Sequence, residues 1–206
     1  MLQSTPVKPT PASPTFTRIL DVAEHLVQTQ GFNGFSYADI SLELGIRKAS
    51  LHHHFATKAD LGKKLISRYH DTFLRALKQI DQDATDPKEK LERYAQIYRE
   101  VLQRKRMCLC GMLAAEFETL PRAMRSGVQS FFAANEAWVV KVLDEGRRGG
   151  VFEFDGSSSA VAHFIISSLE GAMLVARSYG TVARFESVSQ RLLADLRVEP
   201  PARAQR

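Results

Sequence analysis

Residues 17–61 read TRILDVAEHLVQTQGFNGFSYADISLELGIRKASLHHHFATKADL, and this stretch decides the fold. Apolar side chains recur at helical spacing up to Gly31, where a first helix ends. Ser36 is a good N-cap for a second, short helix, which another glycine ends at position 45. A third helix runs from Arg47 to Phe55. The order and spacing of these pieces predict a helix-turn-helix, a motif that places one helix in the major groove of DNA.

The third helix of this motif has an inward face and an outward face. Leu51 and Phe55, four residues apart, point into the core. The outward face carries mainly basic and histidine side chains. We therefore expect DNA contacts from the motif and from the start of the next helix, at Ser36, Arg47, Lys48, Ala49, Ser50, His52, His53, Lys58 and Lys63.

Basic residues are concentrated in the same region. Six lysines and arginines lie between Arg47 and Arg68 against Asp60 alone, so the local excess of five equals the formal net charge of the whole chain, +5. A positive surface of this kind attracts phosphates. The alternative is a basic surface that only faces water, and the helix-turn-helix spacing argues against it.

The same residues resemble the N-terminal domain of the tetracycline-repressor (TetR) family of bacterial regulators. The family pattern is an apolar helix ending in G-[FY], then T/S-x-x-[DE]-[IL]-A, then G-[VI]-x-[KR]-x-x-[LI]-Y-x-[HY]-F-x-[ST]-K-x-x-L. This chain matches it at Gly31, Phe32, Ser36, Ile40, Gly45, Ile46, Lys48, Leu51, His54, Phe55, Lys58 and Leu61. It departs at His52, where the family usually has Tyr, and at Ser41, where the family often has Ala. The resemblance is specific over roughly residues 15–75 and is only architectural beyond them.

The rest of the 206-residue chain is also helical by its pattern, with no strand-period segment of useful length. Helices are expected over residues 58–82, 87–104, 109–118, from 121 to the glycine-rich loop at 146–150, over 158–179 and over 182–196. The fold class is therefore all-α, with about nine helices: an N-terminal three-helix helix-turn-helix domain and a helical ligand-binding and dimerisation domain. The expected divisions are a disordered arm (1–13), the DNA-binding domain (14–74), the effector-binding and dimerisation domain (75–198) and a disordered tail (199–206).

Residues 160–180, AVAHFIISSLEGAMLVARSYG, are apolar over too wide an arc for a helix buried on one side only. Small residues that allow close helix contact occur at Ser167, Ser168, Gly171, Ala172 and Ala176. Burial on two sides fits a helix that packs on its own core and on a second copy of the chain. The resemblance likewise implies a homodimer held by the last two helices, and the alternative is an internal core helix of a monomer.

Aromatic and sulfur-containing residues gather in the middle helices, where ordinary core packing is the simplest interpretation. The family resemblance implies that an effector pocket lies among these helices. The candidate pocket residues are Tyr94, Tyr98, Met112, Glu116, Phe131, Asn135, Trp138 and Glu170. A buried Glu or Asn is as often a structural hydrogen-bonding group as a ligand-binding one.

Cys108 and Cys110 follow Arg104, Lys105 and Arg106 and stand at an expected helix start. Nearby cations and a helix N-terminus both stabilise a thiolate, so either cysteine is a candidate redox or electrophile sensor. The alternative is that both are small apolar core residues. A disulfide between them is not expected, because positions two apart on a helix face different ways.

Other classes of function find little support in the sequence. His52, His53 and His54 point in different directions on a helix, with no acid or thiol nearby, so neither a metal nor a cofactor is expected. No Gly-rich phosphate loop, metalloprotease motif or nucleophile elbow indicates an enzyme. No apolar span looks long enough to cross a membrane, and no export signal is visible. Two cysteines fit a reducing, cytoplasmic setting.

These observations lead to one functional hypothesis with three alternatives. The chain is expected to be a homodimeric transcriptional repressor that binds palindromic double-stranded operator DNA and leaves it when a small-molecule effector binds. Its two reading helices would enter successive major grooves about 34 Å apart. The alternatives are a thiol-based sensor acting through Cys108 or Cys110, an architectural DNA binder without an effector, and an enzyme. The sequence leaves the operator, the effector and an activator role open.

Overall fold

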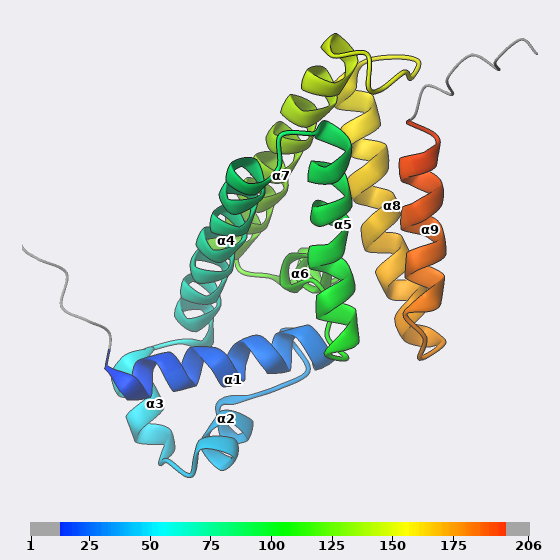
Figure 1. Cartoon of the computed structure of the whole chain (residues 1–206). Helices are drawn as coiled ribbons and strands as arrows, with labels where there is room; N and C mark the ends of the chain where they lie inside the picture. The colour runs from blue at the N-terminus through cyan, green and yellow to red at the C-terminus, as the bar shows by residue number, and fades with distance from the viewer. Residues whose placement is uncertain (1–12, 197–206) are drawn as a thin grey trace, which may run out of the picture.

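The structure, a computed structural model, describes residues 13–196. Within this range the chain forms nine α-helices and one short 3-10 helix, without a strand (Figure 1). The helices are α1 (Pro14–Gln30), α2 (Tyr37–Leu44), α3 (Lys48–His54), α4 (Lys58–Asp83), α5 (Pro87–Gln103), α6 (Leu109–Ala115), η1 (Phe117–Thr119), α7 (Arg122–Arg148), α8 (Ser158–Ser178) and α9 (Ala183–Ala194). The all-α prediction is confirmed. The expected arm and tail lie outside the described residues, apart from Ser13, which caps α1.

Helix starts follow the local signals of the sequence. Ser36 and Asp39 form a reciprocal capping box at α2, Thr57 caps α4, and Asp86 caps α5 just before Pro87. Each cap accepts a backbone N–H that the first helical turn leaves unpaired. These starts therefore depend on residues close in sequence.

Two helix ends differ from expectation. The helix expected over 109–118 stops at Ala115, because the N–H of Glu116 bonds to the carbonyl of Leu113, three residues back, and a separate 3-10 turn follows. Conversely, α7 continues through Gly146 to Arg148. A Cβ at Gly146 would come within 2.0 Å of the Phe152 ring, so the returning chain packs where a larger residue would clash.

The helices form a small head and a larger body that are joined to each other (Figure 1). Helices α1, α2 and α3 make a head, and α4 runs without a break from the head into a body built from α5, α7, α8 and α9, with α6 inside. The domain boundary expected between residues 74 and 75 thus falls inside α4. Glycines permit close contact where α4 meets α7: a Cβ at Gly62 would lie 2.5 Å from the Met124 sulfur, and one at Gly127 would lie 3.0 Å from Ile66 Cγ2.

The longest apolar segment of the described chain is α8. At 21 residues, α8 is long and apolar enough by length and composition to cross a membrane, so the expectation that no such span exists is wrong. A core helix of a helical bundle passes the same test. One face of α8 packs inward through Ile165, Leu169 and Met173, whereas Phe164 on the other face is 61% exposed. The helix is therefore two-sided.

Candidate nucleic-acid interface and its links to the body

Helix α3, the candidate reading helix, is anchored on its inner side by aromatic side chains. Leu51 and Phe55 are buried, as predicted. The Phe55 ring stacks on Phe16 of α1 at a centroid distance of 4.9 Å, and its carbonyl accepts a hydrogen bond from the Tyr37 hydroxyl at 3.0 Å. Burial raises the pKa of Tyr37 to about 12, with Asp60 adding to the effect, so this hydroxyl remains a donor at neutral pH. The anchor fixes the side of α3 that faces solvent.

The outward face of α3 carries the side chains expected there. Arg47, Lys48, Ala49, His52 and His53 are exposed. The ring of His52 lies against Tyr37, with centroids 4.9 Å apart, and its Nδ1 is 3.3 Å from the carbonyl oxygen of Ala56. The imidazole is thus held at the surface in one orientation. Ser50 is half-buried at the edge of the same face.

Two expected DNA contacts at the helix starts already have partners within the chain. Ser36 accepts the N–H of Ala38 and donates its hydroxyl to Asp39 at 2.8 Å, so it serves the α2 cap. Lys63 pairs with Asp60 at 2.7 Å, and both side chains are a little under half exposed. An exposed pair of this kind is weak, so Lys63 can still exchange Asp60 for a phosphate.

The ammonium of Lys58, which the sequence suggests for DNA contact, is occupied by partners within the chain. It donates to the backbone carbonyls of Phe32, at 2.5 Å, and of Phe35. It also lies over both rings, 4.6 Å and 4.1 Å from their centroids. Burial lowers the pKa of Lys58, partly offset by the nearby carboxylates. Through these contacts Lys58 holds the turn between α1 and α2 in place.

Glu116 also differs from the expectation that it lines an effector pocket, because it faces the head and not the body interior. Its carboxylate accepts the backbone N–H groups of Phe32 at 2.5 Å and of Asn33 at 3.1 Å. The Asn33 side chain also donates to the Thr119 hydroxyl at 2.7 Å. Glu116 therefore ties the turn after α1 to the segment between α6 and η1.

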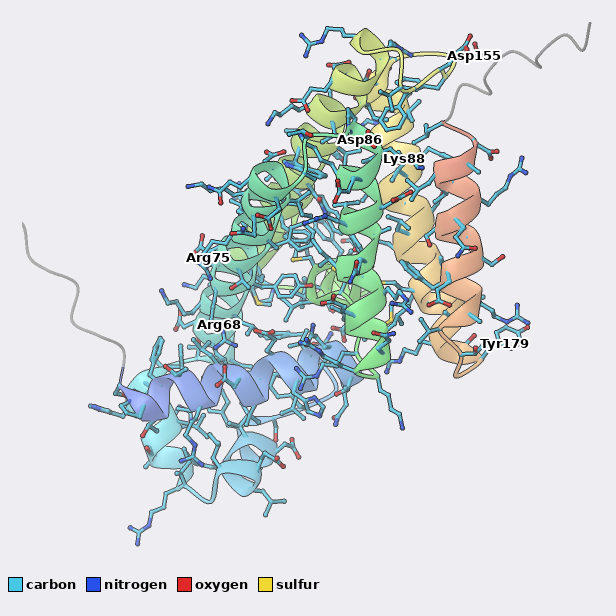
Figure 2. The ribbon with its side chains drawn as sticks, in the orientation of Figure 1. Arg68, Arg75, Asp86, Lys88, Asp155 and Tyr179 are labelled. Carbon is cyan, nitrogen blue, oxygen red and sulfur yellow. The ribbon has the colours of Figure 1, made fainter. Side chains whose placement is uncertain are left out.

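The C-terminal end of α1 is held by two further body elements. The N–H of Met107 donates to the carbonyl of Gln28 at 3.1 Å, and the Arg177 guanidinium, at the end of α8, donates to the carbonyl of Thr29. Farther along α1, Arg68 of α4 pairs with Asp21 at 2.6 Å and with Glu24 at 2.7 Å (Figure 2). The head is thus attached to α4, α6 and α8 together.

Several of the expected pocket residues meet in the core of the body. The hydroxyls of Tyr94 and Tyr98 are 3.0 Å apart, and Asn135 donates to Tyr98 at 3.1 Å. Phe131 is buried beside them. Trp138 lies at the edge of this group, stacked on Tyr94 at 5.5 Å and bonded to Asp81 at 3.2 Å. Tyr94, Tyr98, Phe131 and Asn135 form a packed layer.

Met112 and Glu170 complete the expected pocket set. Met112 is half-buried, with its sulfur 3.5 Å from the Arg177 guanidinium. Glu170 lies beneath Gly111, where an added Cβ would come within 2.3 Å of its Oε2. Burial raises the pKa of Glu170 to about 7. Met112 therefore lies toward the head, and Glu170 lies inside the body.

Three polar atoms of this interior lack a hydrogen-bond partner within residues 13–196: Glu170 Oε1, Asn135 Oδ1 and His70 Nε2. They come from α8, α7 and α4. An unpaired buried polar atom is costly, and each such atom in a folded protein calls for an explanation such as a bound molecule. His70 was not expected here, although its place between Ile66 and Phe73 on the buried stripe of α4 is a signal in the sequence.

Cys108 and Cys110 are core residues with protonated thiols, which corrects the expected thiolate. Both side chains are buried. Burial is the main cause that raises the pKa of each thiol, and the Glu170 carboxylate adds to it. Cys108 accepts the N–H of Gly111 at 3.4 Å as the cap of α6, but this contact does not offset burial.

Both parts of the chain match known families. Residues 19–65 match the family described as bacterial regulatory proteins, tetR family, and residues 87–192 match the tetracyclin repressor-like C-terminal domain. The chain belongs to the TetR family. The resemblance inferred from the helix-turn-helix is confirmed. The protein is a DNA-binding transcriptional regulator of a family that binds operator DNA and forms dimers.

Solved structures and characterised relatives agree with this placement. A TetR-family transcriptional regulator from Agrobacterium tumefaciens is 33% identical, with a TM-score of 0.86 over 89% of this chain and 97% of that one. A TetR regulator from Legionella pneumophila is also 33% identical, with a TM-score of 0.82 over 91% of this chain and 100% of that one. The repressor DhaR of Mycobacterium sp. (strain GP1) is 27% identical over 164 residues, 74% of this chain and 81% of DhaR.

The TetR regulator presents an apolar outer face on its last two helices. Large exposed side chains there are Phe164, Leu174, Val175, Tyr179 and Val188, and Figure 2 shows Tyr179 pointing outward at the end of α8. Gly171 is on the same face, with no atom within 4 Å of an added Cβ. Ala172 and Ala176, which the sequence also suggested for an intersubunit contact, are buried in this chain's own core.

Proposed function

We propose that this TetR-family regulator is a homodimeric repressor that leaves a palindromic operator when a small molecule binds its body. One observation carries the proposal: the turn and helix end behind the reading head are held by Glu116, Met107 and Arg177, which belong to the body. A change in the body therefore changes how the head is held. This is the physical link between two sites that allosteric release requires.

The DNA side of the proposal rests on the exposed face of α3. Arg47, Lys48, Ala49, His52 and His53 would enter the major groove, with Ser50 at the rim and Lys63 at a flanking phosphate. Ser36 contributes through the N-terminus of α2, since its hydroxyl serves the cap. Two heads related by a two-fold axis would read half-sites about 34 Å apart, so the operator would be palindromic.

The dimer would form through α8 and α9. Phe164, Leu174 and Tyr179 are each at least half exposed in the single chain. A contiguous apolar face of this kind marks an interaction surface, and a second copy of the same face satisfies two-fold symmetry. This pairing fixes the distance between the two heads.

The effector would act by shifting populations. Its binding stabilises a dimer whose heads are wrongly spaced, and the shift is only as large as the difference between its affinities for the two states. The unpaired atoms of Glu170, Asn135 and His70 support a polar molecule in the interior. The buried, protonated cysteines favour non-covalent sensing over a thiol reaction. A regulator of this kind acts in the cytoplasm and has no catalytic role.

The test begins with selection of a duplex from a random library by the purified full-length protein. Its affinity is then measured against salt concentration by fluorescence anisotropy, for the wild type, Lys48→Ala and the control Lys78→Ala on the exposed side of α4. Lys48→Ala should weaken binding and reduce the slope of log affinity against log salt, by about 1 if Lys48 contacts a phosphate. Selection of no sequence, or equal effects of both variants, would contradict the proposed reading face.

A further inference from the structure

A cavity of about 390 Å³ lies where α5 ends beside the turn between α8 and α9. Its apolar wall comes from Leu102, Ala176 and Val182. Its polar groups include Lys105, Arg106 and Arg177. The volume is within the range of pockets that bind small organic molecules.

The charge of this cavity is of one sign. Three cations line it, and no acidic residue does. Lys105 and Arg106 make no side-chain hydrogen bond or ion pair within residues 13–196, although the same span holds many paired cations. Like charges held together beside an apolar wall raise the local potential. The cavity therefore attracts an anion.

The end of α5 places these two cations. Lys105 has φ 57°, the one left-handed non-glycine residue in the described part of the chain. The N–H groups of Lys105 and Arg106 bond to the carbonyls of Leu102 and Val101, so Lys105 forms the left-handed cap that ends α5. Here it turns the chain so that Lys105 and Arg106 both reach the cavity.

A simpler explanation for these cations is that they stabilise the C-terminal ends of α5 and α8, since a helix C-terminus favours positive charge. The backbone already pairs several of the terminal carbonyls, however. The N–H groups of residues 104, 105 and 106 bond to the carbonyls of residues 100, 102 and 101, and that of residue 181 bonds to the carbonyl of residue 176. Neither Lys105 nor Arg106 donates its side chain to a carbonyl in the described chain. Their charges remain available to a ligand.

We propose that this cavity binds a small organic anion, a carboxylate or phosphate monoester on a short apolar body, and that this anion is an effector. The anionic group would meet Lys105, Arg106 and Arg177, and the apolar body would lie on Leu102 and Val182. Arginine forms paired hydrogen bonds to such groups, and charge-assisted bonds are the strongest of their kind. The effector role rests on the proposed function, whereas the binding does not.

Arg177 connects the cavity to the reading head. The same guanidinium that lines the cavity donates to the carbonyl of Thr29, at the end of α1. An anion in the cavity competes with that neutral carbonyl for Arg177. Its binding thus weakens one of the ties that hold the head, and DNA binding in turn weakens anion binding, because coupling between two sites is reciprocal.

The binding is tested by calorimetry on the full-length protein without DNA, at constant ionic strength, with hexanoate, hexyl phosphate, inorganic phosphate and hexylamine. Hexanoate or hexyl phosphate should bind once per chain, and the one that binds identifies the anionic group; hexylamine should not bind. Lys105→Gln should weaken binding about tenfold or more, as expected for loss of one charge-assisted bond. The matched control Arg104→Gln removes the same charge one residue away, outside the cavity lining, and should change affinity less than twofold.

Absence of binding by both hexyl anions, or equal losses in the two variants, would overturn the site and leave the cations with only a general electrostatic role. Inorganic phosphate binding as tightly as hexyl phosphate would overturn the apolar part of the proposal. If Lys105→Gln weakened DNA binding as strongly as anion binding, the cations would belong to the DNA surface instead.

The effector role is tested on the selected duplex by anisotropy. The hexyl anion that binds should lower the affinity of wild type for DNA about fivefold or more, within the usual range of allosteric coupling. Arg177→Gln lacks the tie to Thr29, so it should bind DNA about as weakly as the anion-bound wild type and should show no further loss when the anion is added. If the anion binds free protein but leaves DNA affinity unchanged, the effector role is wrong. If the protein selects no DNA, the proposed function fails while the calorimetric result stands.

Discussion

Single charged side chains decide how the head of this regulator is held. Lys58 stands at a family motif position and, from sequence, belongs to the DNA contacts, yet its ammonium is enclosed by two carbonyls and two aromatic rings. Glu116 was expected to orient a ligand, yet it bonds two backbone N–H groups of the head. Sequence predicts that such residues matter, but their partners lie 23 to 84 positions away and no local pattern identifies them.

Lys58→Met should lower the free energy of unfolding by about 2–3 kcal/mol, because two buried carbonyls lose a charged donor. The salt dependence of DNA binding should remain that of wild type, since this ammonium does not reach phosphate. Urea denaturation and anisotropy measure the two effects, with the exposed Lys64→Met on the same helix as control. Unchanged stability with a flatter salt slope would return Lys58 to the DNA surface.

Glu170 should make the stability of the protein depend on pH. Its pKa is raised by burial from 4.5 to about 7 in the folded chain, so the folded state holds a proton that the unfolded state releases. The contribution of Glu170 to stability is therefore full below about pH 4.5 and is lost as the pH rises through 7, by about 3 kcal/mol in all at about 1.36 kcal/mol per pKa unit.

Denaturation midpoints between pH 5 and 8 test this, with Glu170→Gln as the comparison. Between pH 5 and 8 the variant should lose about 2.5 kcal/mol less stability than the wild type, because its amide carries no proton to release. Parallel curves for the two proteins would show that Glu170 is not the group responsible.

At the scale of elements, helix starts were predictable and helix faces only partly so. Ser36, Thr57 and Pro87 act on the next few residues, so their effects are visible in the sequence. The two-sided character of α8 was also visible in its composition. Which residues lie on which side was not, and Ala172 faces the core of its own chain where the sequence allowed an intersubunit contact. That assignment depends on how α8 rotates against α7 and α9.

Leu174→Glu should convert the dimer to a folded monomer, because it places an unpaired carboxylate in the proposed α8 contact at a cost of several kcal/mol. Sedimentation velocity and circular dichroism measure assembly and folding. Leu74→Glu, on an α4 leucine that is 40% exposed where Leu174 is 50% exposed, should remain a dimer. Ala172→Glu should unfold the chain instead. A folded Leu174→Glu dimer would place the interface elsewhere.

Across the whole molecule, head and body share one continuous core and one continuous helix, α4. The family, the fold class and the exposed side of α3 could be predicted because residues close in sequence start and end each helix of the helix-turn-helix. The links between head and body could not be predicted, since Glu116, Met107 and Arg177 join segments that are distant in sequence. The expected pocket set was therefore mixed: Tyr94, Tyr98, Phe131, Asn135 and Glu170 lie in the body core, whereas Glu116 faces the head.

Glu116→Gln should loosen the head without unfolding the body. The Phe32 and Asn33 amides lose a charged acceptor, so their hydrogen exchange should quicken by about tenfold, as about 1.4 kcal/mol of lost protection implies. Exchange in α8 should stay at its wild-type rate. Thr119→Val removes the bond from the Asn33 side chain and the bond that the Thr119 hydroxyl donates to the carbonyl of Glu116, but leaves the Glu116 carboxylate in place, so it serves as a milder control. Unaltered exchange at Phe32 and Asn33 would remove Glu116 from the linkage.

The close contacts of Gly62 and Gly127 hold α4 against α7 near the head end of α4, so a tilt of α4 would turn about this point. At 1.5 Å per residue, Lys58 lies about 6 Å from Gly62 along α4, whereas Ile80 lies about 27 Å beyond it on the other side. When α4 tilts about this point, its start near the head moves less than a quarter as far as Ile80 does. A ligand that displaces the far end of α4 would therefore move the head only slightly, whereas one that acts beside α1 would move the reading helix directly.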